Sequence, residues 1–130
     1  MFNRIYVSAE TDQRLRMLKA RTSLAPNIIC RIGFCLSLNE PGVPDPSLFG
    51  TTQAREFNRY TLTGAWDELF FALLRERLAA DGLDLSLEEE QFRAHVSRGV
   101  LLLTQRLKTI ADLGSMVEHA NAAATLEVGP

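Results

Sequence analysis

The sequence predicts an all-α fold: a compact helical domain of about five helices with a short extended segment at its N-terminus. Apolar side chains recur at helical spacing through most of the 130 residues, whereas the alternation typical of a strand is seen at residues 2–7. Apolar residues make up 46% of the chain and charged residues 23%, which is ordinary for a globular protein. A chain of this length suits one domain, which we expect to span residues 1–124, followed by a flexible tail at residues 125–130.

The first helix is predicted to follow the extended segment directly and to run to about Arg21. Ile5 and Val7 share one face of the extended segment, and Ser8 can cap the helix by accepting a backbone hydrogen bond. The predicted inner stripe of this helix consists of Thr11, Leu15, Leu18 and Thr22. Basic residues flank that stripe: Arg14 and Arg21 on one side, Arg16 and Lys19 on the other.

Pro26 suits the first position of a second helix, because the missing backbone donor costs nothing there. This helix is apolar on most sides, so it is expected to be buried in the domain or in an oligomer interface. Gly33 within it indicates a close crossing with another helix. Three prolines and two glycines exclude regular structure over much of residues 39–52, and residues 56–62 have no clear assignment.

The remaining chain is predicted to form three more helices. The third begins near Ala65 and stops at Gly82. Its predicted core face consists of Trp66, Leu69, Phe70, Leu73, Leu74 and Leu78. Ser86 and Glu89 are expected to form a capping box for the fourth helix. The apolar face of the fourth continues through Phe92, Val96, Leu103 and Leu107, and a fifth helix follows Thr109.

Basic residues are concentrated at the N-terminus. Residues 1–38 carry six basic and two acidic groups, whereas residues 39–130 carry eight basic and fourteen acidic groups, for a net charge of −2. Arginine outnumbers lysine twelve to two, and its planar guanidinium matches the oxygens of a phosphate. Local anion binding at the N-terminal region and the arginine usage of a GC-rich genome both explain this pattern.

The sequence predicts no catalytic residue, no metal site and no cofactor. Cys30 can be interpreted as a reactive thiol, but its isoleucine neighbours favour a small buried apolar side chain. His95 and His119 lack partners at metal-ligand spacing, and Glu88–Glu90 suit the first turn of a helix. Without a signal peptide or a membrane-spanning stretch, the chain is expected in the cytoplasm and away from membranes.

A strand followed by two helices resembles the start of ribbon-helix-helix DNA-binding proteins, in which strands pair across a dimer and enter a DNA groove. Arg4 and Tyr6 would then be the exposed side chains of the strand. Backbone N–H groups near Asn27, at the start of the second helix, would be available to a phosphate. A solvated basic helix face without any partner explains the same residues.

Extended similarity identifies a more specific family. The stretches Arg14–Thr22, Cys30–Leu38, Glu56–Leu62 and Gln91–Val100, together with Pro26-Asn27, resemble the DndE family of DNA sulfur modification proteins. The resemblance covers roughly residues 2–115, and the matching stretches follow one another in the same order as in the family. It depends on similarity along the domain, since none of these stretches is a chemical motif.

This resemblance implies a role in DNA phosphorothioation, in which sulfur replaces a non-bridging oxygen of the DNA backbone. It implies a homotetramer that binds double-stranded DNA, prefers a nicked duplex, and acts beside a sulfur-transfer subunit and an ATPase subunit. The residues that match the basic helix of the family, and would contact DNA, are Arg14, Arg16, Lys19 and Arg21. Arg4 and Arg31 are added to this predicted DNA-binding set.

Three functions remain open on the sequence, and we rank them in the following order. The first is a non-catalytic, DNA-binding accessory subunit that contacts the backbone. The second is an adaptor that positions the sulfur-transfer and ATPase subunits, through Glu56–Leu62 or the acidic C-terminal helices, without binding DNA itself. The third is an enzyme, either a nickase or a sulfur carrier that uses Cys30.

Overall fold

The computed structural model describes the backbone of residues 2–128 and the side chains of residues 2–123. In chain order the elements are β1 (Arg4–Ser8), α1 (Ala9–Thr22), α2 (Pro26–Leu38), β2 (Gln53–Asn58), α3 (Arg59–Thr63), α4 (Asp67–Ala80), α5 (Glu88–Arg106) and α6 (Ile110–Val128). The predicted helical domain is confirmed: in the described chain α1, α2, α4, α5 and α6 are the long helices, and α3 is a single short turn.

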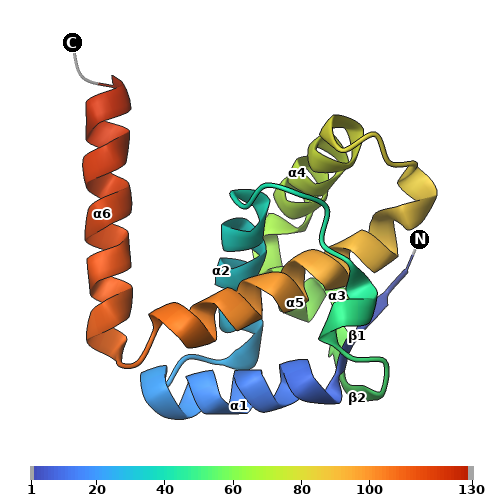
Figure 1. Cartoon of the computed structure of the whole chain (residues 1–130), viewed down its shortest axis with the longest axis horizontal. Helices are drawn as coiled ribbons and strands as arrows, with labels where there is room; N and C mark the ends of the chain where they lie inside the picture. Colours follow the sequence, from blue (N-terminus) through green and yellow to red (C-terminus); the bar gives the residue numbers. More distant parts are fainter. Residues whose placement is uncertain (1, 129–130) are drawn as a thin grey trace.

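Helix α5 runs through the middle of the molecule, with α1 and α4 on opposite sides of it (Figure 1). It packs most extensively against α2. The predicted close crossing is confirmed, because Gly33 of α2 lies directly against Gly99 of α5. A Cβ atom at Gly99 would overlap the carbonyl oxygen of Gly33, so the two backbones meet where only glycine fits.

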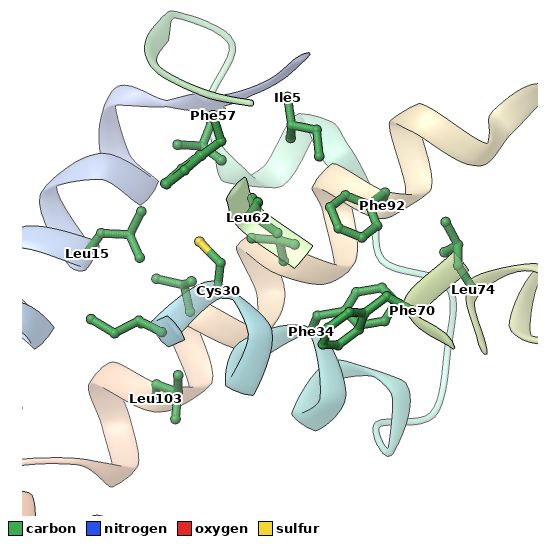
Figure 2. Packing of buried hydrophobic residues seen from close by; sticks show 14 of the residues in the cluster. Ile5, Leu15, Cys30, Phe34, Phe57, Leu62, Phe70, Leu74, Phe92 and Leu103 are labelled. Carbon is green, nitrogen blue, oxygen red and sulfur yellow. The ribbon is translucent and has the colours of Figure 1, made fainter. Parts of the chain in front are cut away.

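The core is formed where β1, β2 and the helices face α2 and α5, as Figure 2 shows for Ile5, Phe57 and Leu62 beside the two helices. Its centre is aromatic: the rings of Phe71 and Phe92 are stacked with their centroids 4.9 Å apart. The predicted inner stripe of α1 is buried, and so are Phe92, Val96, Leu103 and Leu107 of the fourth predicted helix.

Residues 56–62, which the sequence leaves unassigned, form the end of β2 and most of α3. β2 pairs with β1 in an antiparallel sheet, with Ile5 opposite Phe57 and Tyr6 opposite Glu56. The N-terminal strand therefore finds its partner within its own chain, rather than across a dimer as the ribbon-helix-helix comparison suggests. Periodicity could not reveal this, since β2 alternates weakly and buries only Phe57.

Two predictions about the third and fourth helices are wrong in detail. Trp66, Leu69 and Leu73 are exposed rather than buried, at 60%, 52% and 37%, whereas Phe71 joins Phe70, Leu74 and Leu78 in the core. Trp66 lies in the 3-10 turn of residues 64–66, before α4 starts at Asp67, and the packing of α4 turns the side with Leu69 and Leu73 to solvent. The predicted capping box is replaced by Asp84, whose carboxylate accepts from the backbone N–H of Ser86.

Helix α6 projects away from the rest of the molecule (Figure 1). Within the part of the helix whose side chains are described, only Leu113 and Met116 pack against the core. The helix continues past residue 125, where the predicted tail begins, and residues 129–130 lie outside the described chain. No helix among residues 2–128 combines the length and apolar character that crossing a membrane requires.

Candidate nucleic-acid interface

The basic residues of α1 project from a helix that is fixed at both ends. At its start, Ser8 accepts from the backbone N–H of Thr11 at 3.2 Å, as the sequence predicts. At its end, Ser23 adopts a left-handed conformation, with φ of 62°, and its N–H donates to the carbonyl of Lys19. Burial of the inner stripe orients the helix, so its basic residues lie along the edges and the outer face.

Two of the predicted DNA-binding residues are paired with carboxylates. Arg4 on β1 is exposed and forms an ion pair with Glu56 on β2. The hydrogen bond to Glu56 and the charge of its carboxylate raise the pKa of Arg4. Arg16 is paired with Asp12, at 3.1 Å, and Asp12 is also paired with Arg55. These carboxylates reduce the local positive potential that an anion would meet.

Two further predicted residues hold neighbouring helices. Arg21 donates from Nη1 to the carbonyls of Thr104 and Leu107, at 3.2 and 3.3 Å, at the C-terminal end of α5. Arg31 donates from Nε to the carbonyl of Leu62, at 2.6 Å, at the end of α3. A neutral carbonyl does not offset the positive charge of either arginine, but both guanidinium groups point toward other elements of the protein.

Arg14 and Lys19 remain available. Neither side chain has a hydrogen bond or ion pair with the part of the chain that the structure describes, and Nη1 of Arg14 is buried without a partner. They are five residues apart, which places them about 140° apart around the helix, at its two edges. Arg14 is on the same side as Arg21, and therefore faces α5.

The structure adds one residue that the sequence does not single out, Arg93 on α5. Ten of the twelve arginines form a hydrogen bond or an ion pair within residues 2–123, and the exceptions are Arg14 and Arg93. Nε of Arg93 is buried and unpartnered, like Nη1 of Arg14. Only the tertiary structure brings Arg93 together with residues 6–8 of β1 around one pocket, so no local pattern could have identified it.

We refer to Arg14, Lys19 and Arg93 as the free cations. An unpaired guanidinium or ammonium group retains its full capacity to donate hydrogen bonds to an external anion. A buried donor without an acceptor is unfavourable, so an anion that reached Arg14 or Arg93 would relieve that cost. The free cations are therefore the arginine and lysine side chains of the described chain whose donors are not used within it.

The remaining candidates for chemistry, Cys30 and Glu88, have structural explanations. Cys30 is buried in the core (Figure 2), and burial raises the pKa of its thiol to about 12, so at neutral pH it is protonated. It is the small buried apolar side chain that the sequence favours. Glu88 is paired with Arg75 at 3.1 Å. Among residues 2–123 no group of three His, Cys, Asp or Glu side chains is arranged to hold a metal ion.

His95 lies in the core, in a chain of hydrogen bonds. Arg98 donates from Nε to Oγ of Ser37 at 2.8 Å, and that oxygen lies 2.8 Å from Nδ1 of His95. Because arginine can only donate, Oγ of Ser37 accepts from Arg98, whereas Nε2 of His95 is buried without a partner in the described chain. Burial, with the nearby charges of Arg98 and Arg77, lowers the pKa of His95 to about 4.

This histidine should make the stability of the protein depend on pH. In the unfolded chain His95 binds a proton near its ordinary pKa of 6.5, whereas in the folded chain it does so only near 4. Stability is therefore highest above pH 6.5 and falls between pH 6.5 and 4, by up to roughly 1.4 kcal/mol per pH unit. Urea unfolding at a series of pH values should show this slope, His95→Gln should flatten it, and His119→Gln, at an exposed site, should not. Equal slopes for the wild type and His95→Gln would contradict the assignment.

Together, the fold and the free cations define a small, mainly helical protein with a basic outer helix. The family model of the DNA sulphur modification protein DndE matches residues 4–111. The chain therefore belongs to the DndE family, which is involved in DNA phosphorothioation. The resemblance that the sequence suggests is confirmed.

Solved structures show the same fold. The crystal structure of DndE from Escherichia coli B7A, involved in DNA phosphorothioation modification, has a TM-score of 0.66 at 23% identity, covering 79% of this chain and 97% of that chain. The crystal structure of a DndE mutant involved in DNA phosphorothioation has a TM-score of 0.61 at 24% identity, covering 79% and 98%. No curated protein matches the chain. The family match ends at residue 111, so nearly all of α6 lies outside it.

Proposed function

We propose that this protein is a non-catalytic accessory subunit of the DNA phosphorothioation system and that it binds the backbone of double-stranded DNA. The observation that carries this proposal is the set of free cations, Arg14, Lys19 and Arg93, in a family that is involved in modifying DNA. Every other arginine has a partner within residues 2–123. Unpaired cations at the two edges of one exposed helix and beside it suit an extended anion better than a small one.

Contact through arginine and lysine is suited to a backbone that is modified. Such contacts are made to phosphates, which are the same at every step of the duplex, so they position a protein without reading bases. The choice of modified site then belongs to other subunits, which we propose are the sulfur-transfer and ATPase subunits. A non-catalytic role is supported by the position of Cys30, the candidate sulfur carrier, which is protonated and buried.

We propose that the functional unit is a homotetramer. Exposed apolar side chains on α4, together with Cys35 and the half-buried Ile32 and Leu36 on α2, provide a surface that a second copy can cover. The exposed members on α4 and just before it are Trp66, Leu69 and Leu73. In an assembly, the modest positive charge of residues 1–38 would be repeated, which strengthens the local field that a long polyanion meets.

A preference for nicked duplex is part of the proposal. The free cations are distributed over α1 and α5 rather than along one straight line. We propose that the duplex bends to reach all three of them, and bending a continuous helix costs free energy. A nick interrupts base stacking on one strand and reduces that cost, so a nicked duplex can meet more cations.

The test is a salt titration of binding to an intact duplex and a singly nicked duplex of the same sequence. The affinity of the wild type should fall steeply with salt, and the nicked duplex should bind more tightly. Charge reversal of Arg14 and Lys19 together should weaken both complexes by at least about tenfold and reduce the log–log salt slope by about 2. Sedimentation equilibrium of the same samples gives the mass of the binding species.

Arg75→Glu is the matched control, since Arg75 is an exposed arginine on α4 that is paired with Glu88. Figure 1 shows α4 across α5 from α1. This variant should bind both duplexes nearly as tightly as the wild type. A loss in Arg75→Glu as large as that in the single reversals Arg14→Glu and Lys19→Glu would mean that only net charge matters, and the proposed interface would be abandoned.

An adaptor that positions the other subunits without binding DNA is the second candidate. The exposed apolar residues of α4, and the projecting helix α6 with exposed Ile110 and Val117, favour it. If neither duplex binds at low salt, the adaptor function replaces the DNA-binding one.

A further inference from the structure

A pocket of about 320 Å³ lies between β1, the loop of residues 46–51 and the outer side of α5. The side chains that line it and carry polar groups are Tyr6, Ser8, Ser47, Thr51, Glu90, Arg93 and Ser97. Its size is at the small end of the range of about 300–1,000 Å³ that ligand pockets span. It therefore suits a compact polar group, with a short attached segment, rather than a large ligand.

Arg93 is the one cation of this pocket. Its guanidinium has no acceptor within the described chain, and its Nε is buried. The hydroxyl groups of Ser97 and Tyr6, which also line the pocket, form no hydrogen bond with residues 2–123. These donors have no acceptor among residues 2–123, and they line one recess.

The chemistry of these donors selects an oxyanion. A guanidinium fork and several hydroxyl groups match a group with several oxygen acceptors and a negative charge, and a phosphate has both. Glu90 on the same helix opposes an anion, and so does Glu10, whose carboxylate lies against Gly50 of the pocket wall, so Arg93 must outweigh both. A phosphate monoester carries about −1.5 to −2 charges near pH 7 and gains more from Arg93 than a singly charged diester does.

We propose that this pocket holds the terminal phosphate of a nucleic acid strand. An internal phosphodiester continues into a sugar on both sides and must run along the surface, whereas a strand end can enter a recess. This inference rests on the proposed function, because Arg93 is one of the free cations that we assign to the DNA backbone. It adds a site that recognises a strand end to a surface that otherwise contacts any phosphate.

The experiment compares duplexes with a single nick that carries a 5′-phosphate, a 3′-phosphate or only hydroxyl groups. The wild type should bind one of the phosphorylated nicks at least about tenfold more tightly than the hydroxyl nick, since hydrogen bonds to charged groups are strong. In Arg93→Gln this ratio should fall to about one, even where all complexes weaken. Ser97→Ala should lower the ratio by a smaller factor.

Glu90→Gln separates this proposal from a pocket for a ligand with donors of its own. Removing the carboxylate should increase the preference for the phosphorylated nick, because the repulsion disappears. A lower preference in Glu90→Gln would mean that Glu90 accepts hydrogen bonds from the ligand, and would overturn the phosphate assignment. A wild-type ratio of one would overturn it as well.

Thermal unfolding with inorganic phosphate and with a 5′-phosphorylated dinucleotide keeps the two proposals apart. If no duplex binds, the proposed function fails, but stabilisation by the dinucleotide that disappears in Arg93→Gln still supports the pocket. If inorganic phosphate stabilises the protein and the dinucleotide does not, the pocket takes free phosphate and the strand-end assignment is overturned. Arg93→Gln should melt like the wild type without ligand, because Arg93 has no partner in the described chain to lose.

Discussion

Replacing Gly99 with alanine should destabilise the protein by about 3 kcal/mol or more, the upper part of the range for overpacked cores. The added Cβ would overlap the carbonyl oxygen and carbon of Gly33, which are backbone atoms and cannot rotate away. To accept it, α5 and α2 must separate, and this helix pair is the most extensive contact in the fold. The separation would open the core around Phe34 and Val100.

The measurement is chemical unfolding at equilibrium, with two glycine variants for comparison. Gly33→Ala should cost less, because its Cβ would lie 3.0 Å from the nearest atoms of Gly99 and Val100. Gly114→Ala on α6 has no atom within 4 Å and should stabilise slightly, since alanine is the better helix former. If the free energy of unfolding of Gly99→Ala is within about 0.5 kcal/mol of that of the wild type, the close crossing is not the feature that fixes α2 on α5.

Replacing Asp67 with asparagine should also cost roughly 3 kcal/mol or more, because it leaves Arg59 as an unpaired buried charge. The side chains of Arg59 and Asp67 are only 4% and 15% exposed, and two hydrogen bonds of 3.0 Å join them. The Arg59 guanidinium also lies 3.9 Å from the centroid of the Phe71 ring. The pair thus joins the start of α4 to α3 and the aromatic core.

Glu56→Gln is the matched control for this variant. It removes the carboxylate charge from an ion pair with Arg4 whose side chains are 68% and 37% exposed, so it should cost less than about 1 kcal/mol. Burial alone would raise the pKa of Asp67, but hydrogen bonds from Arg59 and Thr63 and the charge of Arg59 lower it below 3.8. The difference between wild type and Asp67→Asn should therefore shrink as the pH falls below 3.8. Similar losses in the two variants would show that burial does not distinguish these pairs.

The sequence by itself determined most of the helices. The cap at Ser8, the buried stripe of α1, Pro26 at the start of α2 and the close crossing at Gly33 are all confirmed. These features are local, because helical periodicity, caps and glycine preferences act within a few residues. Similarity along the chain also identified the family, which the match over residues 4–111 confirms.

The tertiary structure alone decided which strand pairs with β1 and which side of α4 faces the core. β2 lies 45 residues or more after β1, and its pairing depends on how the intervening helices pack. Trp66 and Leu69 satisfy the helical pattern as well as Phe71 does, but Trp66 lies in a 3-10 turn before α4 and the packing of α4 turns Leu69 to solvent.

The tertiary structure also decided which cations are free. The sequence does not distinguish among the six predicted DNA-binding residues. In the structure, Arg4 and Arg16 are paired with carboxylates, and Arg21 and Arg31 donate hydrogen bonds to carbonyls of other elements. Arg14 and Lys19 have neither kind of partner within the described residues. Arg93 on α5 is likewise without a partner among residues 2–123. The sequence fixes the charge of each side chain, whereas its partner depends on contacts between residues far apart in the chain, and those exist only once the core has formed.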